Sequence, residues 1–139
     1  MSEKPIVTFD ELYRRAKAVL NPRQLSDDAD AGGVAAALLT PGGNIYTGVC
    51  IDTACSMGFC AEHAAAAAMI TAGENQVVKM IAVDKRGISI PPCGRCREFI
   101  WQLHPDNWKA EVMVAEDTVV TLDVLLPYHW RASSESENS

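Results

Sequence analysis

Two short cysteine-containing segments constrain this chain more than any other part of its sequence. One is Cys60-Ala61-Glu62, and the other is Pro92-Cys93-Gly94-Arg95-Cys96, whose first cysteine follows Cys60 by 33 positions. A Cys-x-x-Cys pair at the start of a helix places both sulfurs on its first turn, where free backbone N–H groups and the helix dipole favour thiolates. Three such thiolates suit zinc, so we predict that Cys60, Cys93 and Cys96 bind one Zn²⁺ ion.

Glu62 is the candidate for acid–base chemistry beside this metal. Three protein ligands leave one corner of a tetrahedral zinc ion open to water, whose pKa the metal lowers to roughly 7. Glu62 lies two residues after the first thiolate, so it can face the site without being a ligand, and we predict that it carries protons. The alternative is a closed, structural zinc site. There His63, on the same helical face as Cys60, would be the fourth ligand.

Arg95 is the candidate for balancing the charge of the site. Three thiolates on one zinc ion leave a net negative cluster, which makes a bound water less acidic. The N-termini of the two helices offset part of that charge. Arg95 lies between Cys93 and Cys96, and we predict that it donates to a sulfur. Arg97, slightly further along, is either a second such donor or ordinary surface charge.

The composition indicates one domain. A length of 139 residues with 48% hydrophobic residues suffices for a single core. We assign the domain to residues 1–131 and expect the polar, acidic residues 132–139 to be disordered. The two remaining cysteines, Cys50 and Cys55, are expected to be buried thiols rather than a disulfide, because disulfides are rare in a reducing compartment.

The charge balance excludes several classes of partner. Eighteen acidic and 12 basic residues give a net charge of −6, which would repel a phosphate backbone and leaves no basic stripe for nucleic acid. The first residues lack the features of a signal peptide, and no apolar run approaches the ~20 residues of a membrane span. We therefore expect a cytoplasmic protein with a small neutral or cationic substrate and neither nucleic acid nor membrane as a partner.

The apolar pattern predicts an α/β fold. Helices are expected at 8–20, 60–73 and 93–103, a turn or helix at 122–126, and a loop at 23–33. Strands are expected at 34–39, 44–51, 77–83, 111–115 and 118–121. Alternation of strands with helices favours a sandwich in which a mixed five-stranded sheet has helices on both faces.

With these motifs in view, the chain resembles the cytidine deaminase superfamily from its first helix to about Trp130. Its pattern of Cys-x-Glu followed by Pro-Cys-x-x-Cys is typical of zinc-dependent deaminases. The free-nucleoside branch fits best, because the first ligand is Cys rather than His and the chain is short and acidic. Four segments are similar to blasticidin S deaminases: 43–49, 86–88, 93–97 and 103–105.

The resemblance implies hydrolytic removal of the 4-amino group of a cytosine nucleoside or related small molecule, releasing ammonia. It implies one zinc per subunit, Glu62 as the proton carrier, and a homotetramer with active sites completed across interfaces. Arg86 and Tyr128 match substrate-contacting positions of the blasticidin branch. Trp130 would stack on a base or sugar, and the alternative for both aromatic residues is simple packing.

The resemblance has one notable departure in the substrate pocket. Cytidine deaminases hold the ribose hydroxyls with an Asn-x-Glu pair, whereas this chain has Cys50-Ile51-Asp52 at that place. Cys50 and Asp52 are therefore candidate substrate-binding residues with altered chemistry. Two other functions stay open. One is a non-catalytic, zinc-stabilised binding module of the same fold, and the other is a nucleic-acid deaminase, which would need a basic groove.

Overall fold

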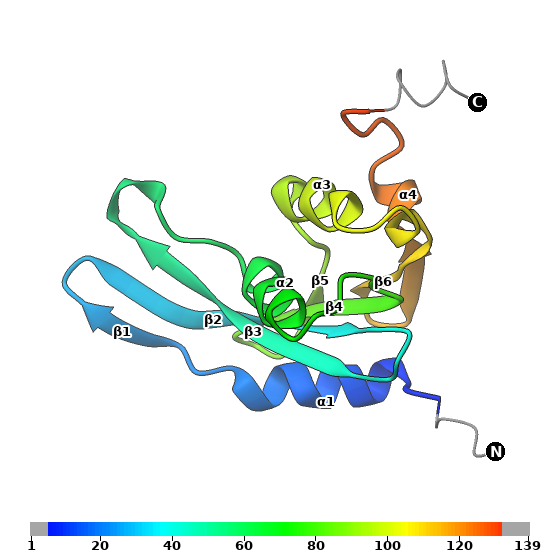
Figure 1. Cartoon of the computed structure of the whole chain (residues 1–139). Coiled ribbons are helices and arrows are strands. Elements are labelled where there is room, and N and C mark those ends of the chain that lie inside the picture. Colours follow the sequence, from blue (N-terminus) through cyan, green and yellow to red (C-terminus); the bar gives the residue numbers. More distant parts are fainter. Residues whose placement is uncertain (1–5, 132–139) are drawn as a thin grey trace.

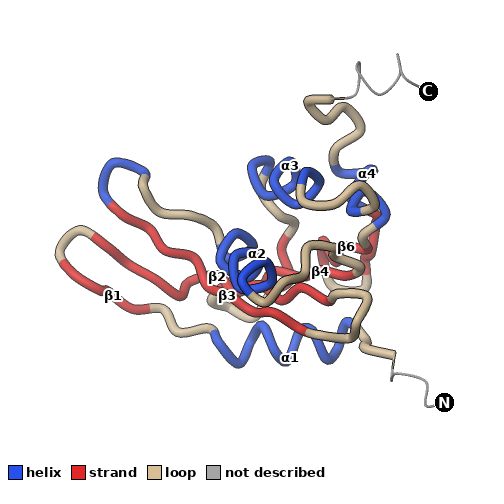
Figure 2. Tube along the Cα trace, viewed as in Figure 1, coloured by secondary structure: helices blue, strands red, loops and turns tan. Residues whose placement is uncertain are grey.

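The computed structural model describes residues 6–131, which form a mixed sheet with helices on both faces (Figure 1). Helix α1 (Phe9–Val19) covers one face, and α2 (Ala61–Thr71) and α3 (Gly94–Gln102) cover the other. Figure 2 shows the strands between these two layers of helices. The predicted α/β sandwich is confirmed. The predicted disordered tail, 132–139, lies outside the described residues.

Seven strands build the sheet within residues 6–131. They are β1 (Arg23–Ser26), β2 (Ala29–Leu39), β3 (Ile45–Thr53), β4 (Lys79–Asp84), β5 (Ser89–Ile90), β6 (Glu111–Ala115) and β7 (Thr118–Thr121). The main order is β1-β2-β4-β6-β7, with β3 paired to β2 and β5 paired to β4. Only the β4–β6 pair is parallel among these strands.

The predicted strand number of five is wrong, because β1 and β5 were not expected. The region 23–33, predicted as a loop, forms β1 and the start of β2. All four residues of β1 are exposed, so its polar composition resembles a loop. It is nevertheless held by pairing with β2, as in the Arg23–Ala31 and Gln24–Asp30 pairs. Strand β5 has only two residues, which is too short to leave a periodic pattern.

The predicted helices are confirmed, and their ends show the expected capping. The Thr8 hydroxyl accepts a hydrogen bond from the Glu11 N–H at 3.2 Å, which satisfies a free donor of the first turn of α1. Gly73 follows α2 with a φ of +95°, the left-handed conformation typical of a helix end. A short helix α4 (Leu122–Leu125) and two single turns, η1 (Ala54–Ser56) and η2 (Asn107–Lys109), complete the fold. None of the described helices is both long and apolar enough to cross a bilayer.

Strand β2 separates two hydrophobic cores. Ala35, Ala37 and Leu39 pack with α1, whereas Ala36 and Leu38 pack with α2 and α3. This follows from the two-residue period of a strand, whose successive side chains point to opposite faces. The run is apolar throughout because both faces of β2 are covered.

Gly48 brings α2 unusually close to the sheet. A Cβ atom placed on Gly48 would lie 2.4 Å from the backbone nitrogen of Ala65 and 2.7 Å from the Ala64 Cβ. The alanine-rich helix therefore packs tightly on β3, which is one explanation for its run of alanines. Close packing between subunits is a second explanation, for which Ala67 and Ala68 are exposed, and it stays a prediction.

Candidate metal and catalytic site

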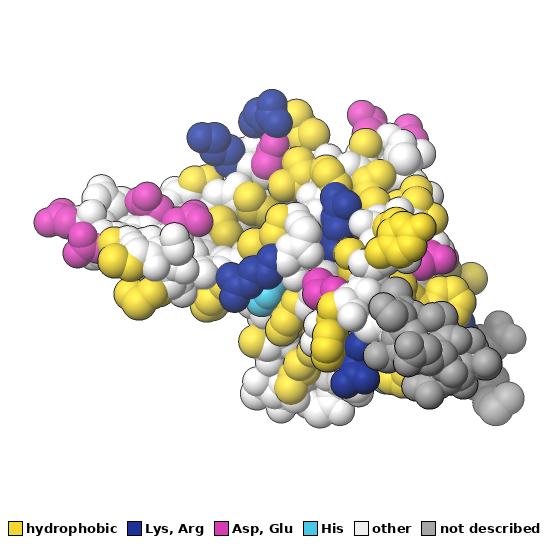
Figure 3. All heavy atoms as spheres, turned by 90° about the horizontal axis from the view of Figure 1, so that it is seen from above, with side chains coloured by type: hydrophobic (Ala, Val, Ile, Leu, Met, Phe, Trp, Pro, Cys, Tyr) yellow, Lys and Arg dark blue, Asp and Glu magenta, His cyan; other side chains and the backbone are white. Residues whose placement is uncertain are grey.

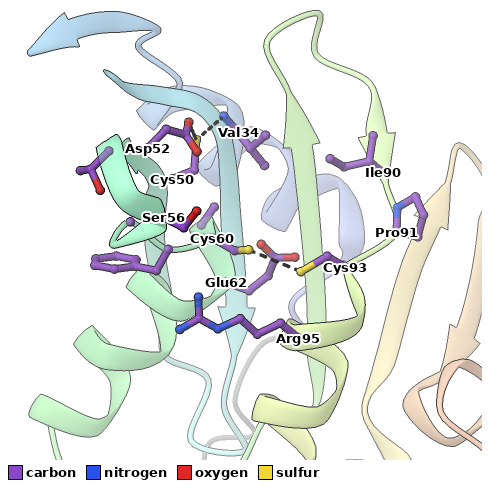
Figure 4. Close-up of a pocket in the computed structure, with 14 residues that line it drawn as sticks. Val34, Cys50, Asp52, Ser56, Cys60, Glu62, Ile90, Pro91, Cys93 and Arg95 are labelled. Carbon is purple, nitrogen blue, oxygen red and sulfur yellow. Dashed lines mark hydrogen bonds between the residues drawn. The ribbon is translucent and has the colours of Figure 1, made fainter. Parts of the chain in front are cut away.

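The site lies where α2 and α3 begin. Cys60 is the N-cap of α2 and Cys93 is the N-cap of α3, both with extended backbone conformation, and Cys96 is buried on the first turn of α3. The Cys60 and Cys93 sulfurs are 3.4 Å apart, and the Cys93 and Cys96 sulfurs are 3.5 Å apart. All three lie within 4.8 Å of one another, and no other described residues form such a cluster. The predicted ligands are thus brought together by two helix N-termini, as Figure 4 shows for Cys60 and Cys93.

The electrostatics of this cluster fit a divalent cation. Burial raises the pKa of Cys60 and Cys96 above the usual thiol value, and the charge of Glu62 adds to both shifts. Burial would also raise the pKa of Cys93, but hydrogen bonds from neighbouring backbone N–H groups and thiols bring it below its usual value. Thiolates this close repel one another unless a cation lies between them. Three sulfurs in this arrangement are a donor set that zinc prefers.

Glu62 points into the same site without joining the sulfur cluster. It is the second residue of α2 and only 3% exposed. Figure 4 shows its carboxylate between Cys60 and Cys93. Burial raises the pKa of Glu62, and a hydrogen bond from its own backbone N–H and one from Cys96 reduce this shift. A buried carboxylate with a raised pKa is suited to accepting and donating protons near neutral pH.

His63 contacts a sulfur rather than completing the ligand set. Its Nδ1 lies 3.4 Å from the Cys96 sulfur, and its ring stacks on Phe99 with centroids 4.0 Å apart. Burial and the positive charge of Arg95 lower the pKa of His63, which favours a neutral ring; the tautomer of that ring decides whether Nδ1 or the sulfur is the donor. Among the described residues the ligand cluster contains the three cysteines and not His63, so the arrangement favours an open site over the closed, four-ligand alternative. This contact between His63 and a sulfur was not predicted from the sequence.

Arg95 lies at the site but does not make the predicted contact. Figure 4 shows its side chain extending from α3 toward α2. Within residues 6–131 no hydrogen bond joins Arg95 to a sulfur, and the side chain that reaches Cys96 is His63. The expected hydrogen bond from Arg95 to a sulfur is therefore not formed, and the guanidinium is directed toward α2 instead. Charge balance by Arg95 over a longer distance stays a prediction.

A cavity of about 560 Å³ opens beside the sulfurs. It is lined by Val34, Cys50, Asp52, Thr53, Ser56, Gly58, Phe59, Cys60, Ala61, Glu62, Ile90, Pro91, Cys93 and Arg95. The structure thus brings both predicted pocket residues of β3 to the same cavity as Glu62. The sulfur of Cys50 accepts a hydrogen bond from the Val34 N–H at 3.3 Å and lies 3.9 Å from the Asp52 carboxylate. Cys50 is buried, as predicted, whereas Cys55 is exposed in η1, so the prediction of a buried thiol is wrong for Cys55.

Three other predicted substrate contacts lie away from this cavity. Arg86 forms an ion pair with Asp84 at 2.7 Å in the turn between β4 and β5. Tyr128 is 87% exposed and Trp130 is 62% exposed. Trp130 lines a separate groove beside the end of α3. Arg86, Tyr128 and Trp130 could contact a substrate only in the cavity of a neighbouring subunit. Their role in substrate binding stays a prediction.

Comparisons with known proteins agree with this geometry. Residues 10–112 match the family described as the cytidine and deoxycytidylate deaminase zinc-binding region. A cytidine deaminase of Halalkalibacterium halodurans is 33% identical over 98 residues, which cover 68% of this chain and 74% of that protein.

Solved structures of similar proteins share the fold. The cytidine deaminase from Mycobacterium leprae has a TM-score of 0.74 and 28% identity, covering 88% of this chain and 100% of that one. The cytidine deaminase from Burkholderia pseudomallei has a TM-score of 0.72 and 26% identity, covering 89% and 100%. Because the family match spans most of the sequence and includes both cysteine segments, the chain belongs to the cytidine and deoxycytidylate deaminase family.

Proposed function

We propose that this protein is a zinc-dependent hydrolase that removes the 4-amino group of a cytosine nucleoside or a related cytosine-containing small molecule. The observation that carries the proposal is the placement of Glu62. Its carboxylate is buried, lies outside the ligand cluster and faces both the sulfurs and the cavity. A structural zinc site has no use for such a group, whereas a hydrolytic site requires it.

Cys60, Cys93 and Cys96 would hold the zinc ion, which when bound lowers the pKa of a water molecule and so provides a nucleophile at neutral pH. His63 would hold the sulfur of Cys96 in place through its Nδ1. The positive ends of α2 and α3, with Arg95 nearby, would offset the negative charge of three thiolates.

Glu62 would carry two protons in turn. Its carboxylate accepts a proton from the attacking water as the water oxygen bonds to C4 of the ring, and it then donates that proton to N3. It next takes the remaining hydroxyl proton from the new C4–OH group and passes it to the amino nitrogen. The C4–N bond breaks, ammonia leaves, and the ring keeps a carbonyl at C4.

The β3 side of the cavity would receive the sugar or its replacement. There Cys50 offers a thiol, a weak hydrogen-bonding group, where an amide would bind a hydroxyl well. Asp52 offers an acceptor, and it pairs across the sheet with Asp30. Figure 3 shows acidic side chains gathered at the end of the molecule that the β1–β2 hairpin forms. This charge favours neutral or cationic groups that donate hydrogen bonds, so cytidine, deoxycytidine, blasticidin S and modified cytosine compounds are all candidate substrates.

We further propose that the active protein is a homotetramer that works in the cytoplasm on small molecules, without nucleic acid. Arg86, Tyr128 and Trp130 would then reach the cavity of a neighbouring subunit. The exposed positions Ala67, Ala68 and Ile70 on α2 support subunit packing, because small and apolar side chains allow close contact between helices.

The test is a panel of cytosine compounds incubated with the zinc-loaded protein. Loss of the ultraviolet absorbance of the 4-amino chromophore, together with ammonia release, is expected for at least one member. The Glu62→Gln variant is the matched control, since it should keep zinc and the fold but lose turnover by several orders of magnitude. If the protein binds one zinc per chain and no compound releases ammonia, the binding-module alternative replaces this proposal.

A further inference from the structure

The side chain of Arg97 connects two distant carbonyl groups. Its Nε donates to the Pro92 carbonyl at 2.8 Å, and its Nη1 donates to the Leu125 carbonyl at 3.1 Å. Arg97 is only partly exposed on α3. The sequence left two alternatives for Arg97, a donor to a sulfur or ordinary surface charge. Its hydrogen bonds to two carbonyl groups fit neither alternative.

One end of this connection fixes the backbone around a metal ligand. Pro92 is buried and directly precedes Cys93. The backbone N–H of Arg97 also donates to the Cys93 carbonyl, at 3.1 Å. Arg97 therefore holds the carbonyl groups on both sides of the Cys93 α-carbon, which restrains its φ of −67° and ψ of 166°. These two angles fix the direction of the Cα–Cβ bond, so they limit the positions that the sulfur can take.

The other end of the connection holds the C-terminal segment, which we define as residues 125–131. Leu125 is the last residue of α4, and its carbonyl accepts the hydrogen bond from Arg97. The Trp130 N–H donates to the Glu98 carboxylate at 2.9 Å, and the rings of His129 and Trp101 stack with centroids 4.4 Å apart. These contacts hold the C-terminal segment against α3, the helix whose start carries two of the three sulfurs.

We propose that Arg97 is a positioning residue for the metal site, which fixes the backbone on both sides of Cys93 and anchors it to the carbonyl of Leu125. The guanidinium is suited to this role because its planar set of donors can bond two carbonyls at once, which a lysine ammonium on a flexible stem cannot reproduce with the same geometry. This role rests on the proposed zinc site but not on the proposed substrate.

The experiment replaces Arg97 in the full-length protein and measures metal binding without any substrate. Arg97→Met removes both hydrogen bonds, and Arg97→Lys keeps the positive charge. Zinc affinity is measured by competition with a chelator, and the absorption spectrum of bound Co²⁺ reports the arrangement of the sulfurs. We expect Arg97→Met to weaken zinc binding by roughly 10- to 100-fold and to alter the Co²⁺ spectrum, as is usual when a partner of a metal ligand is lost. Arg97→Lys should lie between the wild type and Arg97→Met.

The matched control is Glu98→Ala, which releases the C-terminal segment from α3 at Trp130 but leaves the hydrogen bonds of Pro92 intact. It should keep the wild-type affinity and spectrum. If Arg97→Met does not fold, as judged by circular dichroism, the zinc affinities of Arg97→Lys and Glu98→Ala are compared instead, and the proposal then requires weaker binding by Arg97→Lys. Wild-type zinc affinity in a folded Arg97 variant, or an equal loss in Glu98→Ala, would overturn the proposal. A loss of zinc affinity in the folded Arg97 variants would support the positioning role of Arg97 even if the protein deaminates no cytosine compound.

Discussion

Gly48→Ala tests whether the approach of α2 to β3 fixes the position of the metal site. The added methyl group would lie 2.4 Å from the Ala65 backbone nitrogen and 2.8 Å from the Ala64 carbonyl carbon. Backbone atoms cannot turn aside, so α2 must move by about 1 Å to restore an ordinary contact distance. Overpacking of this kind destabilises a protein by about 1–3 kcal/mol. For a domain of this size, that loss lowers Tm by roughly 3–10 °C.

The same movement should weaken metal binding, because Cys60 begins α2 and metal–ligand distances tolerate only about 0.2 Å. Thermal unfolding with and without zinc measures the first effect, and chelator competition measures the second. Gly33→Ala is the matched control, since its added methyl group would have no neighbour within 4 Å and its backbone has no positive φ. If Gly48→Ala unfolds at the same temperature as Gly33→Ala and binds zinc equally well, the close packing of α2 on β3 is not what holds the site.

Four further predictions follow from other contacts. Removing zinc with a chelator should lower Tm, and adding zinc should restore it, because the ion binds only the folded arrangement of sulfurs. His63→Ala removes the contact with the Cys96 sulfur and should weaken zinc binding by about 10-fold, which chelator competition would detect; unchanged affinity would show that this contact is unimportant. Zinc affinity should fall with falling pH between about pH 8 and pH 6, by about tenfold per pH unit for each proton released. The sign follows because the raised pKa values of Cys60 and Cys96 keep these thiols protonated without metal, so a flat profile would contradict the electrostatic reasoning. Asn107→Ala removes a fully buried side chain that bonds the Val77 N–H at 2.8 Å and the Ile100 carbonyl at 2.8 Å, and chemical denaturation should show a loss of about 2–4 kcal/mol of unfolding free energy.

The metal site was predictable because its signal is local. Cys60, Cys93 and Cys96 each lie at or near a helix start, so spacing along the chain nearly determines their arrangement in space. The position of Glu62 was predictable for the same reason, because it lies two residues after Cys60 at the start of α2. Most strands were also predictable, because burial on one or both faces leaves a clear apolar pattern.

Features that depend on tertiary contacts could not be predicted. Strand β1 is exposed along its whole length, so only its pairing with β2 reveals it. The contact of His63 with Cys96 depends on how α2 lies against α3, and no spacing rule gives that angle. Arg97 reaches a carbonyl 28 positions away in the sequence, and a single sequence contains no sign of such a bond. The roles of Tyr128 and Trp130 are equally hard to predict from the sequence, because they would depend on contacts with a neighbouring subunit.

The alternation along β2 has a consequence for how this protein can change over evolution. Ala36 and Leu38 belong to one core while Ala35, Ala37 and Leu39 belong to the other. Inserting or deleting one residue here would exchange the two sets and disturb both cores together. Length variation should therefore be confined to turns such as the one at 40–44. Because the two cores share this strand, we also expect the layers to unfold in one cooperative transition rather than separately.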